Sequence, residues 1–371
     1  MSARVGVNLL WLVPGVVGGS EESTLASLRA MHDLAPTDLS IELFALDELR
    51  DAHPDVVAAL PTTTLRLPGR LKPLRVASEA TWLSAKARGL DLVHHAGGTA
   101  PPLRTAPYVL TVHDLQPLEA TATHGAVKRA YLRAVLPRSV RRARAVVVPS
   151  GFVRTGVVER FGVEPALVHV VPHGVQTWPA APADEVRGRY GITGPVVLYP
   201  AITYPHKNHA VLVEAFGRIA AEHPAAQLVL TGGAGSAEEA LVAQVARLGI
   251  SDRVVRTGRI PRADLGALYG LADVVAVPSR YEGFGLPAVE AMAFGAPLVA
   301  ARATALPEVV GDAGELVDPD DVDGWAATLG RLLGDRAERQ RLAAGARERA
   351  ERFTWPSNAK ALLDVYRAAL R

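Results

Sequence analysis

Two glutamates in one glycine-containing segment are the residues of this 371-residue chain whose types and spacing most clearly predict chemistry. Glu282 and Glu290 lie in SRYEGFGLPAVEAMAFGAP, residues 279–297. Gly283 and Gly285 permit a tight turn and a close approach to a ligand, and the proline that follows suits the first turn of a helix. The N–H groups at such a helix start can bind a phosphate. A phosphate flanked by two carboxylates predicts a nucleotide diphosphate that carries a polyol.

This segment resembles the donor-site motif of retaining glycosyltransferase family 4, and especially its mannosyltransferase-like members. The resemblance rests on the Glu282-x7-Glu290 pair in its whole context, YEGFGLPAVEAMAFGAPLVA, and on the lysine-containing PHKNH at residues 205–209. It extends over nearly the whole chain and is strongest from Val196 to Val317. It implies the GT-B fold, an α/β architecture of two facing Rossmann-like domains, each a doubly wound parallel sheet, with an interdomain cleft and a C-terminal crossover helix.

The alternation of apolar runs with helical patterns agrees with two such domains. We predict an N-terminal, acceptor-binding domain over residues 1–175, completed by the crossover helix at 356–371. Residues 176–184, which are rich in alanine and proline and have no hydrophobic period, form the predicted linker. The domain predicted over residues 185–355 binds the nucleotide-sugar donor. Ligands of open parallel sheets gather beyond the carboxyl ends of the strands, so we look for the site at these sheet edges.

The resemblance implies a role for each residue near the motif. Glu290 hydrogen-bonds the nucleotide ribose, and Glu282 lies beside the sugar ring. Lys207 supplies the cation that stabilises the departing phosphate. Arg259 and Ile260 follow a predicted strand where similar enzymes hold the nucleobase, with an ordinary turn as the alternative. The backbone of the loop after Glu282 cradles the diphosphate, and its residues are Gly283, Phe284, Gly285 and Leu286.

The second phosphate-binding cation is not assigned by the sequence. The arginine that the family often has five or six residues before the lysine is replaced by Ile202 and Ala201. The candidates for this cation are His206, Arg259 and Arg280. His206 and His209 also have the spacing of a metal-binding pair, but no nearby carboxylate completes a site. We therefore expect neither a metal nor a cofactor.

The catalytic candidates are His113 in the first domain and Lys207 and Glu282 in the second. It ends the predicted strand TVHDL, and a similar His-Asp pair in the family places the histidine against the donor sugar. A buried, hydrogen-bonded histidine is the alternative. Asp114 would orient the ring, because a carboxylate commonly sets the imidazole tautomer.

A glycine pair, Gly18-Gly19, follows the first predicted strand at residues 5–12. In the family such a pair lies near the donor phosphate, so Gly19 is a predicted donor-binding residue, with a simple tight turn as the alternative. Glu21 and Glu22 come next, and a carboxylate close to a diphosphate would repel it. Either glutamate therefore meets acceptor hydroxyls or caps the helix, and both roles stay open.

The region Lys128–Arg144 is strongly basic, and residues 120–158 contain eight basic and no acidic residues. Its apolar residues recur at helical spacing, which predicts a basic amphipathic helix followed by an arginine cluster. Such a helix can bind anionic lipid head groups, each basic residue contributing about 1 kcal/mol. A solvated face with extended arginines is the alternative. No aromatic residues are interleaved for base stacking, so nucleic acid is not an expected partner.

The composition is that of an ordinary globular protein, and it argues against several other classes of protein. Hydrophobic residues make up 49% of the chain and charged residues 21%, as in ordinary globular proteins, and the net charge of +2 is too small to indicate nucleic-acid binding. The absence of cysteine excludes disulfides and thiolate chemistry. No apolar run approaches the roughly 18 residues that cross a bilayer, so the predicted location is the cytoplasm, peripheral to the inner membrane face if the basic region binds lipid.

The predicted activity is retaining, metal-independent transfer of a hexose to an acceptor hydroxyl of a cell-surface glycan or glycolipid precursor. The best-fitting donor is GDP-mannose, and the acceptor is a glycan or a lipid-linked sugar. A UDP-sugar is the alternative donor. A non-catalytic, lipid-binding protein of the same fold is the second alternative. A nicotinamide-dependent dehydrogenase is disfavoured because the loop GGAGS at residues 232–236 lacks the G-x-G-x-x-G fingerprint.

Overall fold

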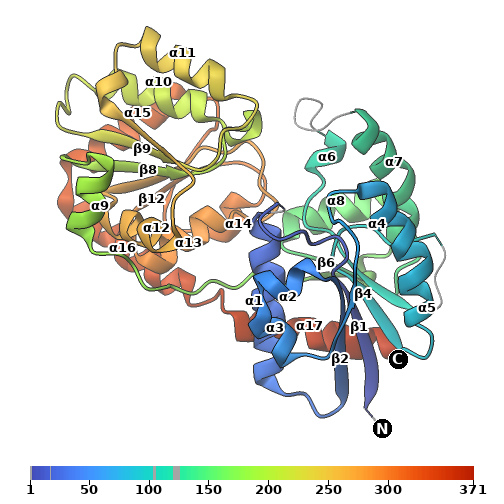
Figure 1. Cartoon of the computed structure of the whole chain (residues 1–371). Coiled ribbons are helices and arrows are strands. Elements are labelled where there is room, and N and C mark those ends of the chain that lie inside the picture. Colours follow the sequence, from blue (N-terminus) through green and yellow to red (C-terminus); the bar gives the residue numbers. More distant parts are fainter. Residues whose placement is uncertain (1, 17, 103–105, 120–125) are drawn as a thin grey trace. The chain divides into compact units, whose positions relative to one another are not determined.

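The computed structural model describes residues 2–16, 18–102, 106–119 and 126–371, which divide into two compact units (Figure 1). Unit 1 comprises Met1–Gly174 and Thr354–Arg371, and unit 2 comprises Val175–Phe353. The predicted linker at 176–184 falls within unit 2. There the Val175 amide donates to the Phe353 carbonyl at 2.8 Å, so the first and last residues of this unit are hydrogen-bonded to each other.

Unit 1 contains a seven-stranded sheet in which all neighbouring strands are parallel. The strand order is β3-β2-β1-β4-β5-β6-β7, and the chain reverses its direction of growth between β1 and β4. Apart from the edge strand β3, which consists of three threonines and a leucine and is half-buried, the strands are mainly apolar and largely buried, as expected when both faces of a parallel sheet are covered. Their bounds are β1 Ala3–Asn8, β2 Leu39–Leu46, β3 Thr62–Leu65, β4 Leu92–His95, β5 Tyr108–Thr111, β6 Ala145–Val148 and β7 Val168–Val170.

The first strand ends earlier than the apolar run at residues 5–12 predicts. β1 stops at Asn8, whose side-chain oxygen accepts a hydrogen bond from the Leu10 amide at 3.0 Å. An asparagine that binds the backbone two residues ahead turns the chain, and this local bond competes with strand pairing. The apolar residues that follow, Leu9, Leu10 and Leu12, are buried beyond the strand.

Helices cover both faces of the sheet in unit 1 (Figure 1). One core contains side chains of α1 and α17 packed on the sheet, and a second core contains side chains of α7 and α8. The predicted crossover helix is α17, and it packs against α1 within this unit. The helices are α1 Gly19–Leu34, α2 Glu48–Ala52, α3 Pro54–Ala59, α4 Lys72–Ser78, α5 Ser84–Lys86, α6 Gln116–Glu119, α7 Ala126–Arg141, α8 Gly151–Phe161 and α17 Trp355–Leu370, with a π-helical turn at Glu79–Leu83 and a 3-10 turn at Pro165–Leu167.

Unit 2 contains a six-stranded parallel sheet with the order β10-β9-β8-β11-β12-β13. This is the strand order of a Rossmann-type sheet, with the point of reversal between β8 and β11. The strands are β8 Val196–Pro200, β9 Gln227–Thr231, β10 Val254–Gly258, β11 Val274–Val277, β12 Leu298–Ala301 and β13 Glu315–Val317.

Two groups of helices complete unit 2 (Figure 1). In the first group, α10 packs against α11 and α15, and in the second, α12 and α13 pack against α9 and α16. The bounds are α9 Ala183–Tyr190, α10 His209–Ile219, α11 Glu238–Arg247, α12 Arg262–Leu271, α13 Leu286–Phe294, α14 Leu306–Val310, α15 Val322–Gly334 and α16 Arg336–Ala350, with 3-10 turns at Pro205–Lys207 and Ser251–Arg253. Among the described residues, no helix combines the length and the apolar character that crossing a lipid bilayer requires.

Two buried histidines end β4 in the centre of unit 1. His94 binds the Tyr366 hydroxyl through Nδ1 and the Thr111 hydroxyl through Nε2, both at 2.7 Å. Nδ1 of His95 lies 3.1 Å from Nδ2 of Asn8. Burial lowers the pKa of both histidines to about 3, and the neighbouring His95 and His113 add to the effect on His94. Both rings are therefore neutral in the folded protein at neutral pH.

The neutral His94 predicts a pH-dependent part of the stability. Its folded pKa of about 3 lies below the ordinary 6.5, so its contribution is fully present above pH 6.5 and is lost as the pH falls toward 3. At pH 5 the expected loss is up to about 2 kcal/mol. The variant His94→Gln keeps hydrogen-bonding atoms but cannot gain the proton. We expect the difference in melting temperature between wild type and variant to shrink from pH 7.5 to pH 5, and a constant difference in calorimetric scans would contradict this.

Candidate functional site

The site predicted for the second domain lies at the reversal point of the sheet in unit 2. β8 and β11 are neighbours there, and the loops that leave their carboxyl ends carry Lys207 and Glu282. In open α/β sheets, ligands bind in the crevice at this point because the two loops diverge to opposite faces. The topology therefore brings together two residues that are far apart in the sequence.

An ion pair joins these two loops. Nζ of Lys207 lies 2.7 Å from Oε1 of Glu282. The side chain of Lys207 is 19% exposed and that of Glu282 is 10% exposed. In a pair so weakly hydrated each charge depends on the other, because removing one charge leaves the other buried without compensation. Lys207 is thus held at the sheet edge, where it can also bind an anionic ligand.

Three further hydrogen bonds support the two loops around this ion pair. The Tyr199 hydroxyl, which is buried at the end of β8, donates to the Lys207 carbonyl at 2.8 Å. Ser279 lies 2.9 Å from the same hydroxyl, and its Oγ is then the donor. The Arg280 amide donates to the His206 carbonyl at 2.8 Å and links the two loops directly. These bonds restrict both loops, so the lysine and the carboxylate occupy defined positions.

The loop after β11 leads into the start of α13 with the geometry that the glycines predict. Gly285 has a φ of 100° and is the N-cap residue of the helix, and an added Cβ there would lie 2.7 Å from Leu306. The Glu282 amide donates to Oγ1 of Thr304 at 3.0 Å. Thr304 itself has a φ of 54°, a conformation that a β-branched residue rarely adopts. The loop after β12, which carries Thr304, therefore holds the backbone that leads into α13.

The four predicted cradle residues differ in burial at this helix start. Phe284 is buried and packs edge-on against Phe353, with ring centroids 5.6 Å apart. Gly283 and Leu286 are half-buried, whereas Gly285 is buried. The phenyl ring thus anchors the loop in the core, and backbone of the same loop lies nearer the surface. This arrangement can present N–H groups to an anion.

Glu290 lies in the second turn of α13 and is bound by a tyrosine that sequence reasoning missed. The hydroxyl of Tyr269, on α12, donates to Oε2 of Glu290 at 2.8 Å. Tyr269 is completely buried, whereas Glu290 is half-buried. The pKa of Tyr269 is raised well above its ordinary value. Burial is the larger cause, and the adjacent Glu290 carboxylate is the second. The hydroxyl therefore stays protonated and remains a donor to Glu290.

The glycine loop after β9 packs on the loop after β8. An added Cβ on Gly232 would lie 2.5 Å from the Ala201 carbonyl oxygen, and one on Gly235 would lie 2.6 Å from backbone atoms of Thr203. The Gly235 amide donates to Oγ1 of Thr203 at 2.7 Å. These glycines are required for close backbone packing. This packing accounts for a glycine-rich loop that lacks the dinucleotide fingerprint.

The candidates for the second cation are in different environments. Arg280 binds Asp320, with Nε 2.8 Å from Oδ1. His206 stacks on Tyr204 at 5.9 Å between ring centroids. Arg259 is exposed at the end of β10, and its Nε would lie 3.2 Å from a Cβ added to Gly233. Ile260, the other predicted base-binding residue, is half-buried next to it.

His113 lies beyond the carboxyl end of β5 in unit 1. Its Nε2 is 2.9 Å from the Ala96 carbonyl oxygen and must donate to it, so the neutral ring carries its proton there. Burial lowers the pKa of His113, although the Ala96 bond and the Asp114 charge act in the opposite direction. The prediction that Asp114 orients the ring is wrong in its partner, because Ala96 makes the hydrogen bond. The Asp114 carboxylate accepts from the Gln116 amide at 3.0 Å instead.

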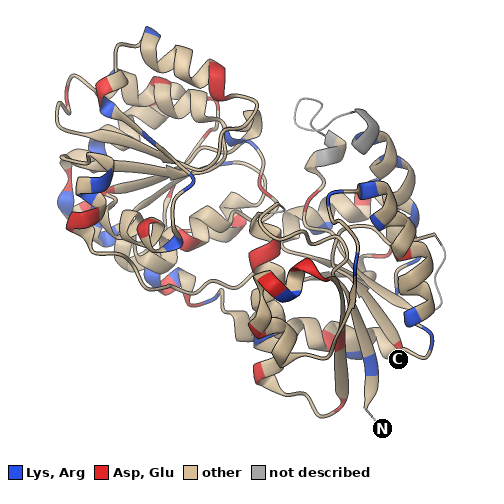
Figure 2. Ribbon diagram, viewed as in Figure 1, with Lys and Arg blue, Asp and Glu red and all other residues tan. Residues whose placement is uncertain are grey.

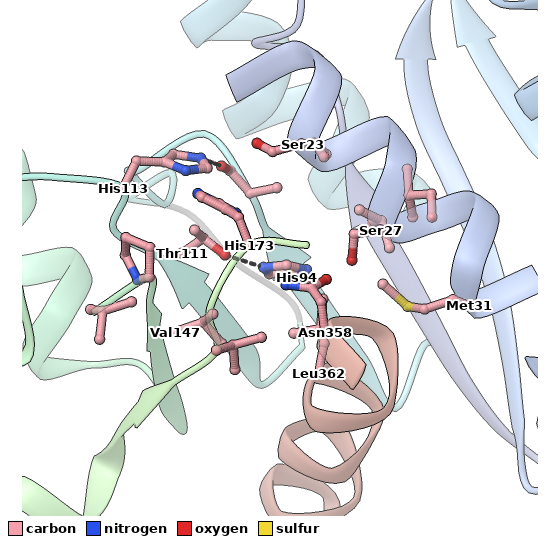
Figure 3. A pocket seen from close by; sticks show the side chains of 17 residues that line it. Ser23, Ser27, Met31, His94, Thr111, His113, Val147, His173, Asn358 and Leu362 are labelled. Atoms are coloured by element: carbon pink, nitrogen blue, oxygen red, sulfur yellow. Dashed lines mark hydrogen bonds between the residues drawn. The ribbon is translucent and has the colours of Figure 1, made fainter. Parts of the chain in front are cut away.

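A small cavity lies beside His113 (Figure 3). It has a volume of about 50 Å³ and is bordered by His173, by Ser27 of α1 and by Asn358 of α17. Among the described residues, Nδ1 of His113, Oγ of Ser27 and Oδ1 of Asn358 are buried without a hydrogen-bond partner. The cavity can hold water, which occupies about 30 Å³ per molecule, but it is far below the ~300 Å³ of ordinary ligand sites.

The start of the first helix in unit 1 shows what Gly19, Glu21 and Glu22 contact or expose. Gly19 is the first residue of α1 and is exposed, and Gly18 before it has a φ of 68°. Glu21 is buried, and its carboxylate accepts from the Gly15 amide at 2.8 Å and binds Nε2 of His53 at 2.9 Å. Glu21 therefore holds the loop that precedes the helix, whereas Glu22 is exposed.

Polar groups also gather at the reversal point of the sheet in unit 1, between β1 and β4. Besides Asn8 and His95, they include Glu79, which is buried and hydrogen-bonded to Asn8. Burial raises the pKa of Glu79 to about 7, although the Asn8 bond and nearby Arg75 oppose the shift. No pattern in the sequence indicated this cluster, because its members come from three separate segments.

The predicted basic helix is α7, on which the basic residues are marked in Figure 2. Arg133 and Arg138 are exposed, while Leu136 and Val140 are buried against the core. The arginine cluster after it continues at residues 141–144, and its three arginines are exposed. Residues 120–125 and the side chain of Lys128 lie outside the part of the chain that the structure describes.

Two known families match the sequence, one over most of unit 2 and the other over most of unit 1. The family described as "Glycosyl transferases group 1" matches residues 184–349, and "Glycosyltransferase Family 4" matches residues 17–178. The predicted donor residues Lys207, Glu282 and Glu290 lie within the first match, and His113 lies within the second.

Two relatives resemble this chain over much of its length. A D-inositol 3-phosphate glycosyltransferase of Acidothermus cellulolyticus is 32% identical over 374 residues, which cover 91% of this chain and 83% of that protein. An MMP alpha-(1->4)-mannosyltransferase of Mycolicibacterium hassiacum is 40% identical over 239 residues. That alignment covers 63% of this chain and 56% of the mannosyltransferase.

Solved structures share the fold over nearly the whole chain. A sucrose-phosphate synthase from Thermosynechococcus elongatus superposes with a TM-score of 0.78 at 22% identity and covers 98% of both chains. Anabaena HepE, solved with UDP and glucose, gives a TM-score of 0.78 at 23% identity and covers 98% of this chain and 99% of that one. The two parallel sheets and these neighbours define a GT-B fold. With the matches in sequence, they show that this chain belongs to glycosyltransferase family 4.

Proposed function

We propose that this glycosyltransferase transfers a hexose from a nucleotide donor to an acceptor hydroxyl with retention of the anomeric configuration, and without a metal. The observation that carries the proposal is the ion pair of Lys207 and Glu282, 2.7 Å apart at the start of α13. It supports a site in which a cation and a carboxylate lie together near the N-terminus of α13. A helix N-terminus can bind a pyrophosphate through its N–H groups.

Each group has a separate task in this proposal. Lys207 and the backbone of residues 283–286 bind the diphosphate and stabilise the charge that develops as the sugar-phosphate bond breaks. Glu282 orients the sugar hydroxyls, and Glu290 accepts hydrogen bonds from the ribose. Arg259 and Ile260 border the nucleobase. The assignments of His113 to the donor sugar and of Gly19 to the phosphate stay predictions that rest on the family resemblance.

Retention follows if the acceptor attacks the face from which the phosphate departs. The acceptor oxygen forms a bond to the anomeric carbon, the bond from that carbon to the phosphate oxygen breaks, and the acceptor proton moves to the departing phosphate. Glu282 is engaged by Lys207, which favours the phosphate over this carboxylate as the base. No protein nucleophile is then needed.

GDP-mannose is the proposed donor. The 40% identity to a mannosyltransferase and 29% identity to an Escherichia coli O-antigen chain mannosyltransferase B support mannose. A UDP-sugar is the alternative, because Anabaena HepE was solved with UDP-glucose. The proposed acceptor is a glycan or a lipid-linked sugar, and an inositol phosphate is a second candidate because of the relatives named D-inositol 3-phosphate glycosyltransferase.

We further propose that α7 and residues 141–144 bind an anionic membrane surface. The exposed arginines Arg133, Arg138 and Arg144 support the proposal, and the sequence from residue 126 to residue 144 contains no acidic residue. A peripheral position would bring the enzyme to a lipid-linked acceptor.

The variants Lys207→Ala and Glu290→Ala test the donor site. Each should lower kcat/KM for the donor at least about a hundredfold, the order expected when an electrostatic or charged hydrogen-bond partner is lost. Lys360→Ala removes an exposed lysine of α17 and is the control, with an expected change below twofold. Full turnover in both site variants would contradict the assignment.

A screen of nucleotides by thermal shift identifies the donor. At a hundred times its dissociation constant a ligand stabilises the protein by ~2.7 kcal/mol. We expect GDP and GDP-mannose to raise the melting temperature more than UDP, UDP-glucose or NADH. A larger shift with the uridine nucleotides would replace GDP-mannose by a UDP-sugar, and the lack of any shift would favour the non-catalytic alternative.

A vesicle flotation assay tests the membrane proposal. At low salt the protein should float with phosphatidylglycerol vesicles but not with phosphatidylcholine vesicles, and the binding should weaken as salt screens the charges. The double variant Arg133→Glu, Arg138→Glu should remain with the soluble fraction. If the wild type fails to bind anionic vesicles even at low salt, the arginines form only a solvated face.

A further inference from the structure

The carboxylate of Glu290 is held by a tyrosine that is itself surrounded by aromatic rings. The Tyr269 hydroxyl donates to Oε2 of Glu290 at 2.8 Å, across the contact between α12 and α13. The two residues are 21 positions apart and belong to different helices. The hydrogen bond joins a fully buried donor to an acceptor at the surface of the unit.

The position of the tyrosine ring is set by its neighbours. It stacks on Phe294 at 5.4 Å with an interplanar angle of 15°, and Trp178 meets it edge-on at 6.4 Å. Trp178 contacts Phe294 at 4.7 Å and donates from Nε1 to the Arg262 carbonyl at 2.6 Å. Because rings packed on two sides cannot swing freely, the hydroxyl has a defined position.

A carboxylate bound in this way has lost most of its freedom to rotate. Glu290 has three side-chain torsions, and an exposed glutamate would populate several rotamers before it binds a ligand. The hydrogen bond to Oε2 selects one of them, so the cost of ordering the side chain is met during folding and not on binding. A fixed acceptor can then distinguish a hydroxyl at one position from a hydrogen at the same position.

We propose that Tyr269 is a positioning residue that orients Glu290 to read the ribose diol of the donor, and that the Tyr269–Glu290 pair selects ribonucleotide over 2′-deoxyribonucleotide donors. The inference rests on the proposed donor site, in which Glu290 meets the ribose. It goes beyond that proposal by naming the residue that gives the carboxylate its selectivity and the substrate feature that the pair recognises.

Binding of paired nucleotides by isothermal titration calorimetry tests the inference. The probes are GDP with 2′-deoxy-GDP and UDP with 2′-deoxy-UDP, and the base that binds more tightly is used. The wild type should prefer the ribonucleotide about tenfold or more, as expected for a hydrogen bond to a charged group. Tyr269→Phe should weaken ribonucleotide binding about fivefold or more and leave deoxyribonucleotide binding within twofold, so that the preference largely disappears. With the full donor, KM should rise while kcat stays within about twofold.

The chain offers a matched control on the same helix. The Tyr190 hydroxyl donates to Oδ2 of Asp264, another residue of α12, at 2.6 Å. Tyr190→Phe therefore removes the same kind of bond, from a tyrosine hydroxyl to a carboxylate, away from Glu290. It should preserve the ribose preference. In addition, 4-aminophenylalanine at position 269 restores a donor in place and should restore part of the preference, which a purely structural role of the ring would not do.

The outcomes separate this inference from the function on which it rests. If Glu290→Ala abolishes the ribose preference but folded Tyr269→Phe keeps it, Tyr269 is only a packing residue and the inference fails while the donor site stands. If the 4-aminophenylalanine variant folds but behaves like Tyr269→Phe, the hydrogen bond is not responsible. If Glu290→Ala itself keeps the wild-type preference, or the wild type has none, Glu290 does not bind the ribose and both assignments fail.

Discussion

The ion pair between Lys207 and Glu282 is the interaction on which the site of unit 2 depends. Both charges are largely removed from water, so each stabilises the other, and neither loop can move far without separating them. An incoming diphosphate would offer Lys207 a second anionic partner at the same place. The pair thus keeps a cation ready at the sheet edge and prevents an unpaired charge when no ligand is bound.

The remaining contacts keep this edge rigid. Tyr199 and Ser279 hold the backbone of the two loops, Thr304 holds the amide of Glu282, and Tyr269 holds the carboxylate of Glu290. Each support is a hydroxyl from a buried or constrained residue. A hydroxyl can hold a charged group in place without adding a charge of its own, which leaves the charge balance of the site unchanged.

Unit 1 presents different chemistry at the equivalent edge of its sheet. Its histidines His94 and His95 are buried and neutral, and Glu79, with a pKa near 7, is readily neutralised by a proton. Neutral groups donate and accept hydrogen bonds but do not attract a diphosphate. The first six strands of the sheet in unit 1 follow the same order as the six strands of unit 2, yet the residues after the strands give the two edges different charge.

The sequence by itself determined the family, the parallel α/β architecture and the glycine-led start of α13, because these follow from local chain chemistry and a long, specific motif. The same motif made Lys207, Glu282 and Glu290 the candidate site residues, whose roles stay predictions. It could not determine that β1 ends at Asn8, that Ala96 and not Asp114 binds His113, or that Glu21 holds Gly15 and His53. Nor could it indicate Thr304 and Tyr269. Apart from the local Asn8–Leu10 and Glu21–Gly15 bonds, these contacts join segments distant in the chain, and only the packing of strands and helices decides which side chains meet.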